Sequence, residues 1–487
     1  MKSFALVSRL AIFGALAACT QVGPDYHLPE QSALRNPAVS KGFGAAHGSE
    51  FSLQPVPDGW WRLYQDSRLN TLVEQGLSAN TDLRVASANL RRAMAVESSV
   101  DADGNPHVTL AGTAQRHQES IEESPLGVRP PVLDDGNFGF RVGYEIDLFG
   151  KLARAEEAAR YDTQASEAAL DLVRITVAAE IVRAYVQNCS ATAELAVATH
   201  QLELQLRSVD VTQRLVSAGR GSVTDVERAR GQAETLQANL PRFRASQDAA
   251  RFRLADLLAL APSQLSASAV DCKEPPQLSQ SLPVGDGAAL LKRRPDVRQA
   301  ERQLAGMTAR IGVATAELYP SVSLGASAGV AERFGQIGNS ASKYWSLGPL
   351  ISWTIPDSGA RARVTAAEVD SEAALAHFDG IVLNALRETE TALTIYSREL
   401  QRNASLKAAR DHSQRAARDS DRLYAVGRLP YLASLDANRV LASSEADLAA
   451  SNAQLLLDQV NLFLALGGSW TRPASETGTE QTATDVH

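Results

Sequence analysis

The 487-residue sequence predicts a mainly α-helical protein that also carries four membrane-length β-strands, organised as two tandem copies of one unit. Within residues 137–150, the side chains from Phe138 to Leu148 alternate between apolar and small or polar without a break, which is the period of a strand with two unlike faces. Residues 345–355 repeat this alternation. Helical runs follow both stretches, from residue 151 to about 217 and from about 361 to 424. Helices of this size would be on the order of 100 Å long, which no compact globular domain needs.

The composition is that of a folded protein without a basic surface. Hydrophobic residues make up 44% of the chain and charged residues 21%, which excludes a disordered or low-complexity sequence. The net charge of −8 argues against a nucleic-acid partner.

The first 18 residues have the features of an export signal. Lys2 and Arg9 supply a basic region, an apolar core follows from residue 10 to 16, and small residues lead to Cys19. This arrangement resembles the bacterial lipobox, in which cleavage falls before a cysteine that then carries the lipid. We therefore expect a lipoprotein signal peptide over residues 1–18 and lipidation of Cys19; the alternative is a non-lipidated signal with a chance cysteine.

Two segments precede the first strands. Residues 19–57 are rich in small and polar residues, and we expect them to form an extended, lipid-anchored tether. The helical spacing of Leu69, Leu72, Val73 and Leu77 predicts N-terminal helices over residues 58–104.

Residues 105–148 and 319–356 are predicted to hold the two pairs of membrane strands. The strand that starts near residue 138 is roughly 11 residues long, which suits a tilted strand that crosses a bilayer. One such strand would fit an ordinary β-sandwich equally well, so the second copy is what favours the membrane. The side chains expected to face lipid are Phe138, Phe140, Val142, Tyr144, Ile146, Leu148, Trp345, Leu347, Ile351 and Trp353.

Long helical hairpins are predicted over residues 149–262 and 357–466. At the tip of the first hairpin, Gly219 suits a helix end and Ser222 or Thr224 suits the next N-cap. Gly427 lies 208 residues after Gly219, within a matching sequence, so the second tip repeats the first. In the last helix a coiled-coil seam is indicated by a leucine at every seventh position, namely Leu441, Leu448, Leu455 and Leu462.

The remaining segments connect or end these units. Residues 263–289 form a Pro/Ser-rich connector, residues 290–318 a helix that leads into the second copy, and residues 467–487 a loose polar tail. Cysteines of an exported chain can pair, but Cys189 lies in a helical run and Cys272 in a loop. A disulfide between them is therefore not the favoured expectation.

Four strands cannot close a membrane barrel, because each unpaired backbone group in lipid costs several kcal/mol. Other copies of the chain must complete the sheet, and three copies would supply twelve strands. The predicted fold is therefore a trimeric 12-stranded β-barrel, with four strands per chain, continued by a long α-helical coiled-coil barrel and built from an internal tandem repeat.

The order and spacing of these motifs resemble the outer-membrane factors, specifically the TolC-like, NodT-type outer-membrane efflux lipoproteins. The resemblance covers nearly the whole mature chain and is carried by residues 22–26, 144–150, 293–301 and 464–468. It implies a passive trimeric exit duct in the cell outer membrane, lipid-anchored and extending into the periplasm. The partners it implies are outer-membrane lipid, a periplasmic adaptor protein and an inner-membrane pump of the RND type. The implied cargo is drugs or other small molecules.

The resemblance also implies that the periplasmic gate and the adaptor-binding rim lie at the hairpin tips. The candidate residues are Gly219, Arg220, Asp225, Gly427, Arg428, Tyr431 and Asp436. Relatives commonly carry acidic tip residues that favour cations, but here Leu429 and Pro430 stand in that turn. Asp225 and Asp436 are the nearest acidic candidates, and ordinary helix-start carboxylates are the alternative for both. Arg428 and Tyr431 are candidates for the links that hold the tips shut.

Three other functions are alternatives to drug efflux. A type I protein-secretion duct would share the fold, and the sequence does not identify the cargo. A structural lipoprotein without a pore would explain the helices and Cys19 but not the four alternating strands. An envelope enzyme is disfavoured, because the eight histidines are scattered and no HExxH, Ser/His/Asp or paired-cysteine signature occurs. We therefore expect no catalytic residue, no cofactor and no metal site.

Overall fold

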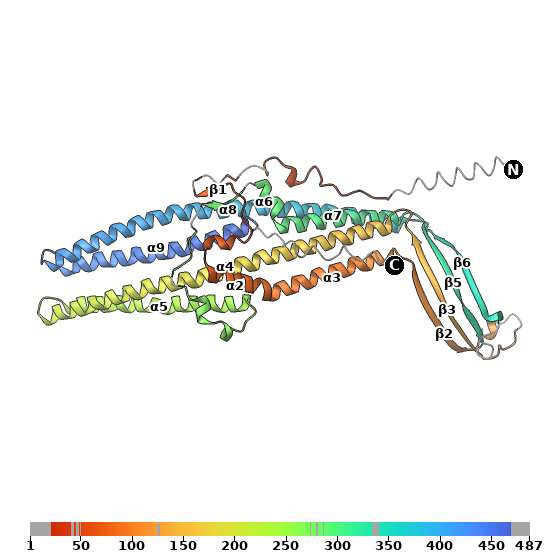
Figure 1. The fold of residues 1–487 in the computed structure, drawn as a ribbon, viewed down its shortest axis with the longest axis horizontal. Helices are drawn as coiled ribbons and strands as arrows, with labels where there is room; N and C mark the ends of the chain where they lie inside the picture. The colour runs from red at the N-terminus through yellow and green to blue at the C-terminus, as the bar shows by residue number, and fades with distance from the viewer. Residues whose placement is uncertain are drawn as a thin grey trace, which may run out of the picture. The chain divides into compact units, whose positions relative to one another are not determined.

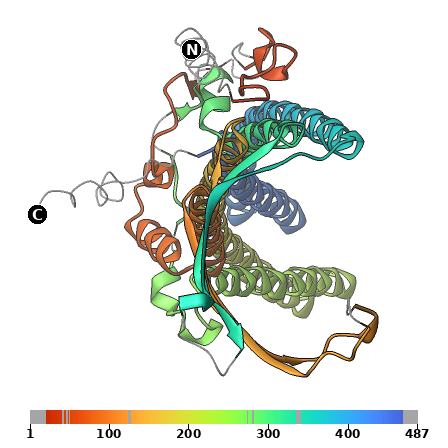
Figure 2. The same ribbon diagram turned by 90° about the vertical axis from the view of Figure 1, so that its right-hand side faces the viewer.

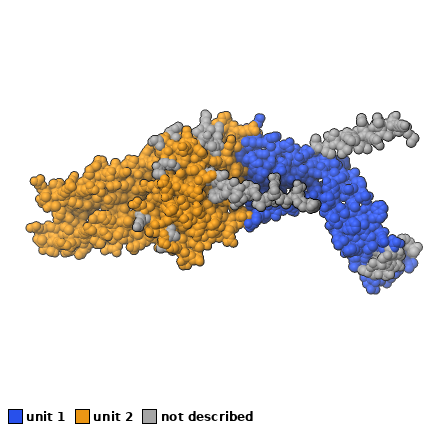
Figure 3. Space-filling model, in the orientation of Figure 1, with its two compact units in different colours: residues 1–30, 89–167, 299–378 blue, residues 31–88, 168–298, 379–487 orange. Residues whose placement is uncertain are grey.

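A computed structural model describes residues 21–39, 43–44, 48, 50–123, 127–272, 274–278, 281–285, 287–333 and 340–468 (Figure 1). The chain forms two compact units, each assembled from three separate stretches (Figure 3). Unit 1 comprises residues 1–30, 89–167 and 299–378, and unit 2 comprises residues 31–88, 168–298 and 379–487. Each unit therefore combines residues from both halves of the sequence.

Unit 1 contains a four-stranded antiparallel sheet. Its strands, in spatial order, are β2 (His107–His117), β3 (Leu133–Ile146), β5 (Ser321–Arg333) and β6 (Lys343–Ser352). The central strands β3 and β5 pair with each other, so the sheet joins a hairpin from each half of the sequence. Figure 2 shows this sheet as a curved band. β2 and β6 are its edges.

Both predicted strand pairs are confirmed, with shifted ends. β3 starts at Leu133, ahead of the predicted start, because Asp134 to Gly136 still pair with β2. β6 ends at Ser352, before the predicted end at Ile355.

The long helices occupy the predicted runs. α4 (Lys151–Ser217) has the predicted bounds, and α8 (Ser358–Ala425) starts three residues before the predicted Arg361. They contribute residues to both units, as do α3 (Thr81–Asp103) and α7 (Pro295–Ala316). Among the described residues, no helix combines the length and apolar character that a membrane span requires.

Unit 2 holds the other helices and a short parallel strand pair. The helices are α2 (Ser67–Ala79), α5 (Val223–Leu257), α6 (Gly287–Arg293) and α9 (Tyr431–Ala465), and the strands are β1 (Phe51–Ser52) and β4 (Leu282–Pro283). The 3-10 helices among the described residues of this unit are Ala33–Arg35, Trp60–Tyr64, Pro262–Gln264 and Ala267–Val270. In unit 1, 3-10 helices occur at Ile121–Glu123 and Ser340–Ser342.

The core of unit 2 is apolar and aromatic. The rings of Trp60 and Phe463 stack with centroids 4.5 Å apart, and both side chains are buried. Leu69 and Leu254 are also fully buried. Burial of one such aliphatic side chain contributes about 1.5–3 kcal/mol. This core joins the Trp60 segment to the end of α9, far away in sequence.

The expectation that Cys189 and Cys272 stay apart is wrong. The structure joins them in a disulfide, with Cα atoms 5.2 Å apart. The connector does not project as a free loop but lies along α4, where Asn188 Nδ2 donates a hydrogen bond to the carbonyl of Val270 at 2.7 Å. Cys272 therefore reaches the buried face of the helix, where Cys189 is 1% exposed.

Candidate channel wall and gate

The register of the sheet collects most of the apolar side chains of the four strands on one face. Phe140 of β3 pairs with Leu110 of β2 and Ala328 of β5, and Ala328 pairs with Trp345 of β6. Directly paired residues project to the same side of an antiparallel sheet. The same face contains Val108, Phe138, Val142, Tyr144, Ile146, Val322, Leu324, Ala326, Leu347, Pro349 and Ile351.

Several of these side chains are solvent-exposed in the isolated chain. Phe138 is 57% exposed, Leu347 68% and Trp345 80%. A continuous exposed apolar face of this kind marks a surface that meets lipid or another protein. The predicted lipid-facing residues thus lie together on one side of the sheet, with two corrections.

Leu148 and Trp353 do not belong to the strands. β3 ends at Ile146 because the chain turns there, with the amide of Leu148 donating to the carbonyl of Ile146 at 2.8 Å. β6 ends at Ser352, and Trp353 Nε1 donates instead to the carbonyl of Leu318 at 3.1 Å. Both residues follow the strand ends.

The opposite face of the sheet is mainly polar, although Leu133 of β3 and Leu350 of β6 also lie on it. It carries Arg141 and Glu145 of β3, which alternate with the apolar residues. The Tyr344 hydroxyl donates to Asn137 Oδ1 at 3.0 Å, across the intervening strand β5. A Cβ atom on Gly139 would lie 2.7 Å from the Tyr344 oxygen, and one on Gly329 2.8 Å from it. Backbone atoms require glycine at both positions, since the carbonyl oxygen of Ala328 would lie 2.8 Å from a Cβ atom on Gly139, and that of Phe138 would lie 2.6 Å from one on Gly329.

The two hairpin tips have the same backbone geometry. Gly219 and Gly427 have φ angles of +70° and +72°, and the amides of the following residues, Arg220 and Arg428, donate to the carbonyls of Leu215 and Leu423, both at 2.8 Å. These are helix C-terminal motifs that use glycine in the left-handed conformation. The side chains of Arg220 and Arg428 are exposed.

The two acidic tip candidates have different surroundings. Asp225 lies in the first turn of α5, where its carboxylate is 3.7 Å from the guanidinium of Arg228. Asp436, in α9, is exposed. The two hairpins also start their second helices differently, since Ser222 caps α5 through its side chain whereas Pro430 precedes α9.

Tyr431 links the two hairpins. Its hydroxyl donates to Ser208 on α4, with Oγ at 2.8 Å and the Ser208 carbonyl at 3.3 Å, and its ring packs against Tyr424 with centroids 5.1 Å apart. Burial raises the pKa of Tyr431, against the side-chain interactions with Ser208 and Thr212 that lower it, so the hydroxyl stays protonated and donates.

Sequence reasoning missed the residues that receive Tyr431. A buried polar stripe runs along α4 through Gln201, Gln205, Ser208 and Thr212. Gln201 Nε2 donates to the carbonyl of Ala442 on α9 at 2.5 Å, and Gln205 Nε2 to the carbonyl of Ala229 on α5 at 2.9 Å. The spacing of three and four residues between polar side chains was the available signal, since it is the period of one helix face.

A groove of about 530 Å³ lies along this stripe, between residues of α4, α5, α8 and α9. On its second-hairpin side, Asp421 of α8 accepts hydrogen bonds from Ser434 Oγ at 2.6 Å and Asn438 Nδ2 at 2.9 Å. Polar groups in this groove therefore form hydrogen bonds within each hairpin and between the two, beside apolar residues such as Leu236 and Leu435.

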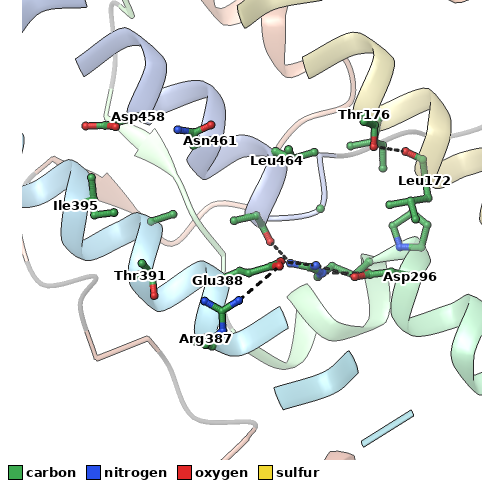
Figure 4. A pocket seen from close by; sticks show the side chains of 16 residues that line it. Leu172, Thr176, Asp296, Arg387, Glu388, Thr391, Ile395, Asp458, Asn461 and Leu464 are labelled. Carbon is green, nitrogen blue, oxygen red and sulfur yellow. Dashed lines mark hydrogen bonds and ion pairs between the residues drawn. The ribbon is translucent and has the colours of Figure 1, made fainter. Parts of the chain in front are cut away.

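Arg294 of the 293–301 motif has a structural position. Its guanidinium is 2.7 Å from Asp296 and 2.9 Å from Glu388, two carboxylates that Figure 4 labels, and it donates to the carbonyl of Ala465 at 2.8 Å. Burial disfavours its charge, but the hydrogen bonds and charges of the two carboxylates outweigh burial and raise the pKa of Arg294. It borders a cavity of about 420 Å³ and ties the start of α7 to α8 and α9.

Cys19, the predicted lipidation site, lies outside the described residues. The same is true of the predicted signal peptide and of the tail beyond residue 468.

Comparison with known proteins identifies the family. The profile of the outer membrane efflux protein family matches residues 72–260 and 288–468. The chain is 28% identical to nodulation protein T of Rhizobium leguminosarum bv. viciae, over 97% of this chain and 95% of that protein. It is 30% identical to the outer membrane protein OprJ of Pseudomonas aeruginosa, over 95% and 96% of the two chains.

The fold has a matching counterpart among solved structures. The structure of the outer-membrane channel OprN superposes with a TM-score of 0.85 at 36% identity, over 92% of this chain and 99% of that one. These matches confirm the resemblance that the sequence motifs carry. The chain belongs to the outer membrane efflux protein family, as the outer-membrane channel component of an efflux system.

Proposed function

We propose that three copies of this chain form one closed exit duct. The observation that carries the proposal is the four-stranded sheet, whose apolar face is continuous and whose edge strands β2 and β6 have no outer neighbour among the described residues. Open edges are not tolerated in lipid, and β6 of one copy can pair with β2 of the next. Twelve strands then close a barrel with the apolar face toward lipid and Arg141 and Glu145 toward the lumen.

The same threefold arrangement would close the helices into a coiled-coil barrel. The two halves of the chain supply equivalent parts, because α4 and α5 have 67 and 35 residues and α8 and α9 have 68 and 35. With the equivalent tip glycines, these lengths support an internal tandem repeat. Three chains would place six hairpins in the ring. In this arrangement residues 105–148 and 319–356 are the membrane part, and the hairpins extend into the periplasm.

The duct acts passively. Solutes move through a water-filled lumen, and the energy comes from an inner-membrane pump, for which the RND type is our proposal, through a periplasmic adaptor that binds the hairpin tips. The chain contributes a wall and a gate, so no catalytic step is assigned to it. We propose drugs or other small molecules as cargo; a type I protein-secretion duct is the second candidate, since it would use the same wall.

The gate is proposed at the hairpin tips. The hydrogen bond from Tyr431 to Ser208 supports this, because it is a link between the hairpins that must break if they separate. Gly219, Arg220, Gly427 and Arg428 form the exposed turns available to the adaptor. Asp225 and Asp436 are the candidates for cation preference, and Asp225 is the weaker one because Arg228 lies beside it.

Single-channel conductance tests this function. The purified, lipidated protein is placed in a planar bilayer, and its mass in detergent is measured in parallel. The expected result is a trimer with small, long-lived, cation-preferring conductances. Trimers that conduct only after the turn over residues 427–431 is loosened would show a closed gate. A monomer without conductance would leave the structural lipoprotein as the explanation.

A further inference from the structure

The first described residues of the chain are held in a built site of unit 1. Arg154, near the start of α4, has a side chain that is only 3% exposed. Its guanidinium donates to the carbonyls of Val22 at 3.2 Å and Gly23 at 3.3 Å, and to Asp25 Oδ1 at 2.7 Å. The fourth contact is an ion pair with Glu157 at 2.6 Å. The buried guanidinium of Arg154 thus binds two carbonyl groups and one carboxylate of the N-terminal segment.

Three glycines make room for this contact. Gly23 has a φ angle of +86°, and a Cβ atom on it would lie 2.4 Å from the Cα atom of Gly312 in α7. A Cβ atom on Gly312 would lie 2.7 Å from Cγ of Arg154. At Gly150, an added Cβ atom would lie 2.5 Å from Cγ of Gln21. We refer to Arg154, Gly150 and Gly312 together as the Arg154 seat, and residues 21–26 occupy it.

Two further contacts fix the direction of the segment. The amide of Val22 donates to the carbonyl of Phe149 at 3.1 Å, immediately after strand β3. At the other end, the Tyr26 ring packs edge-on against Tyr161 with centroids 6.1 Å apart. The segment therefore starts where the sheet ends and runs along the helices, and this part of the predicted tether is held against the protein.

The seat lies at a level where a membrane interface is expected. Phe149 and Tyr319 stack with centroids 4.6 Å apart beside the ends of β3 and β5, and Tyr319 is exposed. Aromatic side chains collect at membrane–water interfaces. Cys19 is three residues before Val22, and three residues span at most about 10 Å. A lipid on Cys19 cannot be far from this level.

We propose that the Arg154 seat delivers the lipid on Cys19 to the membrane leaflet beside the strand ends and so fixes the depth at which the sheet sits in the bilayer. This inference rests on the proposed lipidation of Cys19. The anchor then acts as a short, oriented link to a phospholipid leaflet, and its effect depends on occupation of the seat.

Hydrogen–deuterium exchange tests whether Arg154 holds the segment. The full lipidated protein in phospholipid nanodiscs is compared with Arg154→Met and with Arg160→Met, an exposed arginine of the same helix. The Val22 amide should exchange more than about tenfold faster in Arg154→Met, because the charged hydrogen bonds that close the segment are lost. Arg160→Met should match the wild type. Equal protection in all three proteins would overturn the proposal.

Membrane depth tests the consequence. A fluorophore is attached at Thr354→Cys, beside the strand ends, and its quenching by lipids brominated at known depths is measured. Arg154→Met should shift the fluorophore depth in the lipidated chain but not in a Cys19→Ser chain produced without the lipid. An equal shift in both chains, or no shift in the lipidated chain, would overturn the inference. If Arg154→Met does not fold, Gly23→Ala replaces it. The added Cβ atom would clash with Gly312 and displace residues 21–26 from the seat, while Arg154 stays unchanged.

Mass spectrometry of the N-terminal peptide shows whether Cys19 carries a lipid, and so distinguishes failure of the anchor from failure of the Arg154 seat. If Cys19 carries no lipid, both the anchor and this inference are wrong, while conductance can still support the duct. If Cys19 carries lipid and the depth does not respond to Arg154→Met, only this inference is wrong.

Discussion

The hydroxyl of Tyr431 on α9 donates a hydrogen bond to Oγ of Ser208 on α4, 2.8 Å away, and so connects the second hairpin to the first. Within each hairpin the two helices are already joined by a turn, but contacts between hairpins must come from side chains. Few of the described residues near the tips make such contacts. The Tyr431–Ser208 hydrogen bond is therefore the first contact to remove in a test of the proposed gate.

Replacement of Tyr431 by phenylalanine should favour the open tip. The ring contact with Tyr424 would stay, but the link to Ser208 would be lost, at about 1 kcal/mol for one neutral hydrogen bond. The closed-to-open ratio should fall about fivefold per copy, and the open probability in planar bilayers should rise. Tyr424→Phe is the control, because the described contacts include no hydrogen bond of its hydroxyl. Equal conductance for Tyr431→Phe and the wild type would remove Tyr431 from the gate.

Loss of the disulfide should destabilise unit 2. Cys189 and Cys272 are separated by 83 residues, so their bond removes considerable freedom from the unfolded chain. The double variant Cys189→Ser/Cys272→Ser should lose about 2–4 kcal/mol of stability. Thermal unfolding of the wild type in the presence and absence of reductant should show the same difference, and reductant should leave the variant unchanged. A variant as stable as the wild type would contradict this expectation.

A charge on the apolar face of the sheet should block membrane insertion. Leu347→Arg places a guanidinium on that face, at about 2–4 kcal/mol if the site is near the bilayer centre. Ser346→Arg is the matched control, because the adjacent residue of β6 projects to the polar face. The fraction of protein recovered as folded trimer in vesicles should fall for Leu347→Arg only. If both variants insert equally well, the assignment of faces is wrong.

Asp458 should make the protein less stable as the pH rises. Burial raises its pKa, against a hydrogen bond from Gln454 that lowers it, and its Oδ2 atom has no hydrogen-bond partner in the described part of the chain. The folded state therefore binds the proton more tightly than the unfolded state. Stability falls as the pH rises from the unfolded pKa, about 3.9, to the folded pKa, and is then constant.

Asp458→Asn should accordingly have a higher Tm than the wild type at neutral pH. This advantage should vanish in acid, below the unfolded pKa, where the wild-type carboxyl is protonated in both states. The asparagine oxygen can still accept the hydrogen bond from Gln454. Asp436→Asn, at an exposed position of the same helix, should change the Tm little at any pH.

The helices and strands could be predicted because their periods extend over many residues. The alternation around Phe140 specifies a strand and the side that is apolar, and the uninterrupted run after Lys151 specifies a long helix. The ends were less predictable, since Asp134 to Gly136 look like loop residues but are held in the ladder by their partners in β2. Local composition does not contain that information.

The contacts that join distant segments could not be read from the sequence. Cys272 reaches Cys189 only because the connector packs on α4, and Ser208 becomes a partner of Tyr431 only when two hairpins lie together. Arg154 likewise has no local signal, since its three contacts in the N-terminal segment are about 130 residues away. Such pairs depend on tertiary packing, which the periods of single elements do not fix.

In the proposed trimer, the open edges of β2 and β6 would also link pore formation to the amount of protein that a cell makes. If three chains must assemble before every sheet edge is hydrogen-bonded to a neighbouring strand, the number of pores at low expression follows the third power of the concentration of free chains. A threefold drop in free chains then lowers the number of complete pores about 27-fold at equilibrium. Single chains and pairs would leave no partial opening in the outer membrane, so the barrier stays intact while synthesis is low.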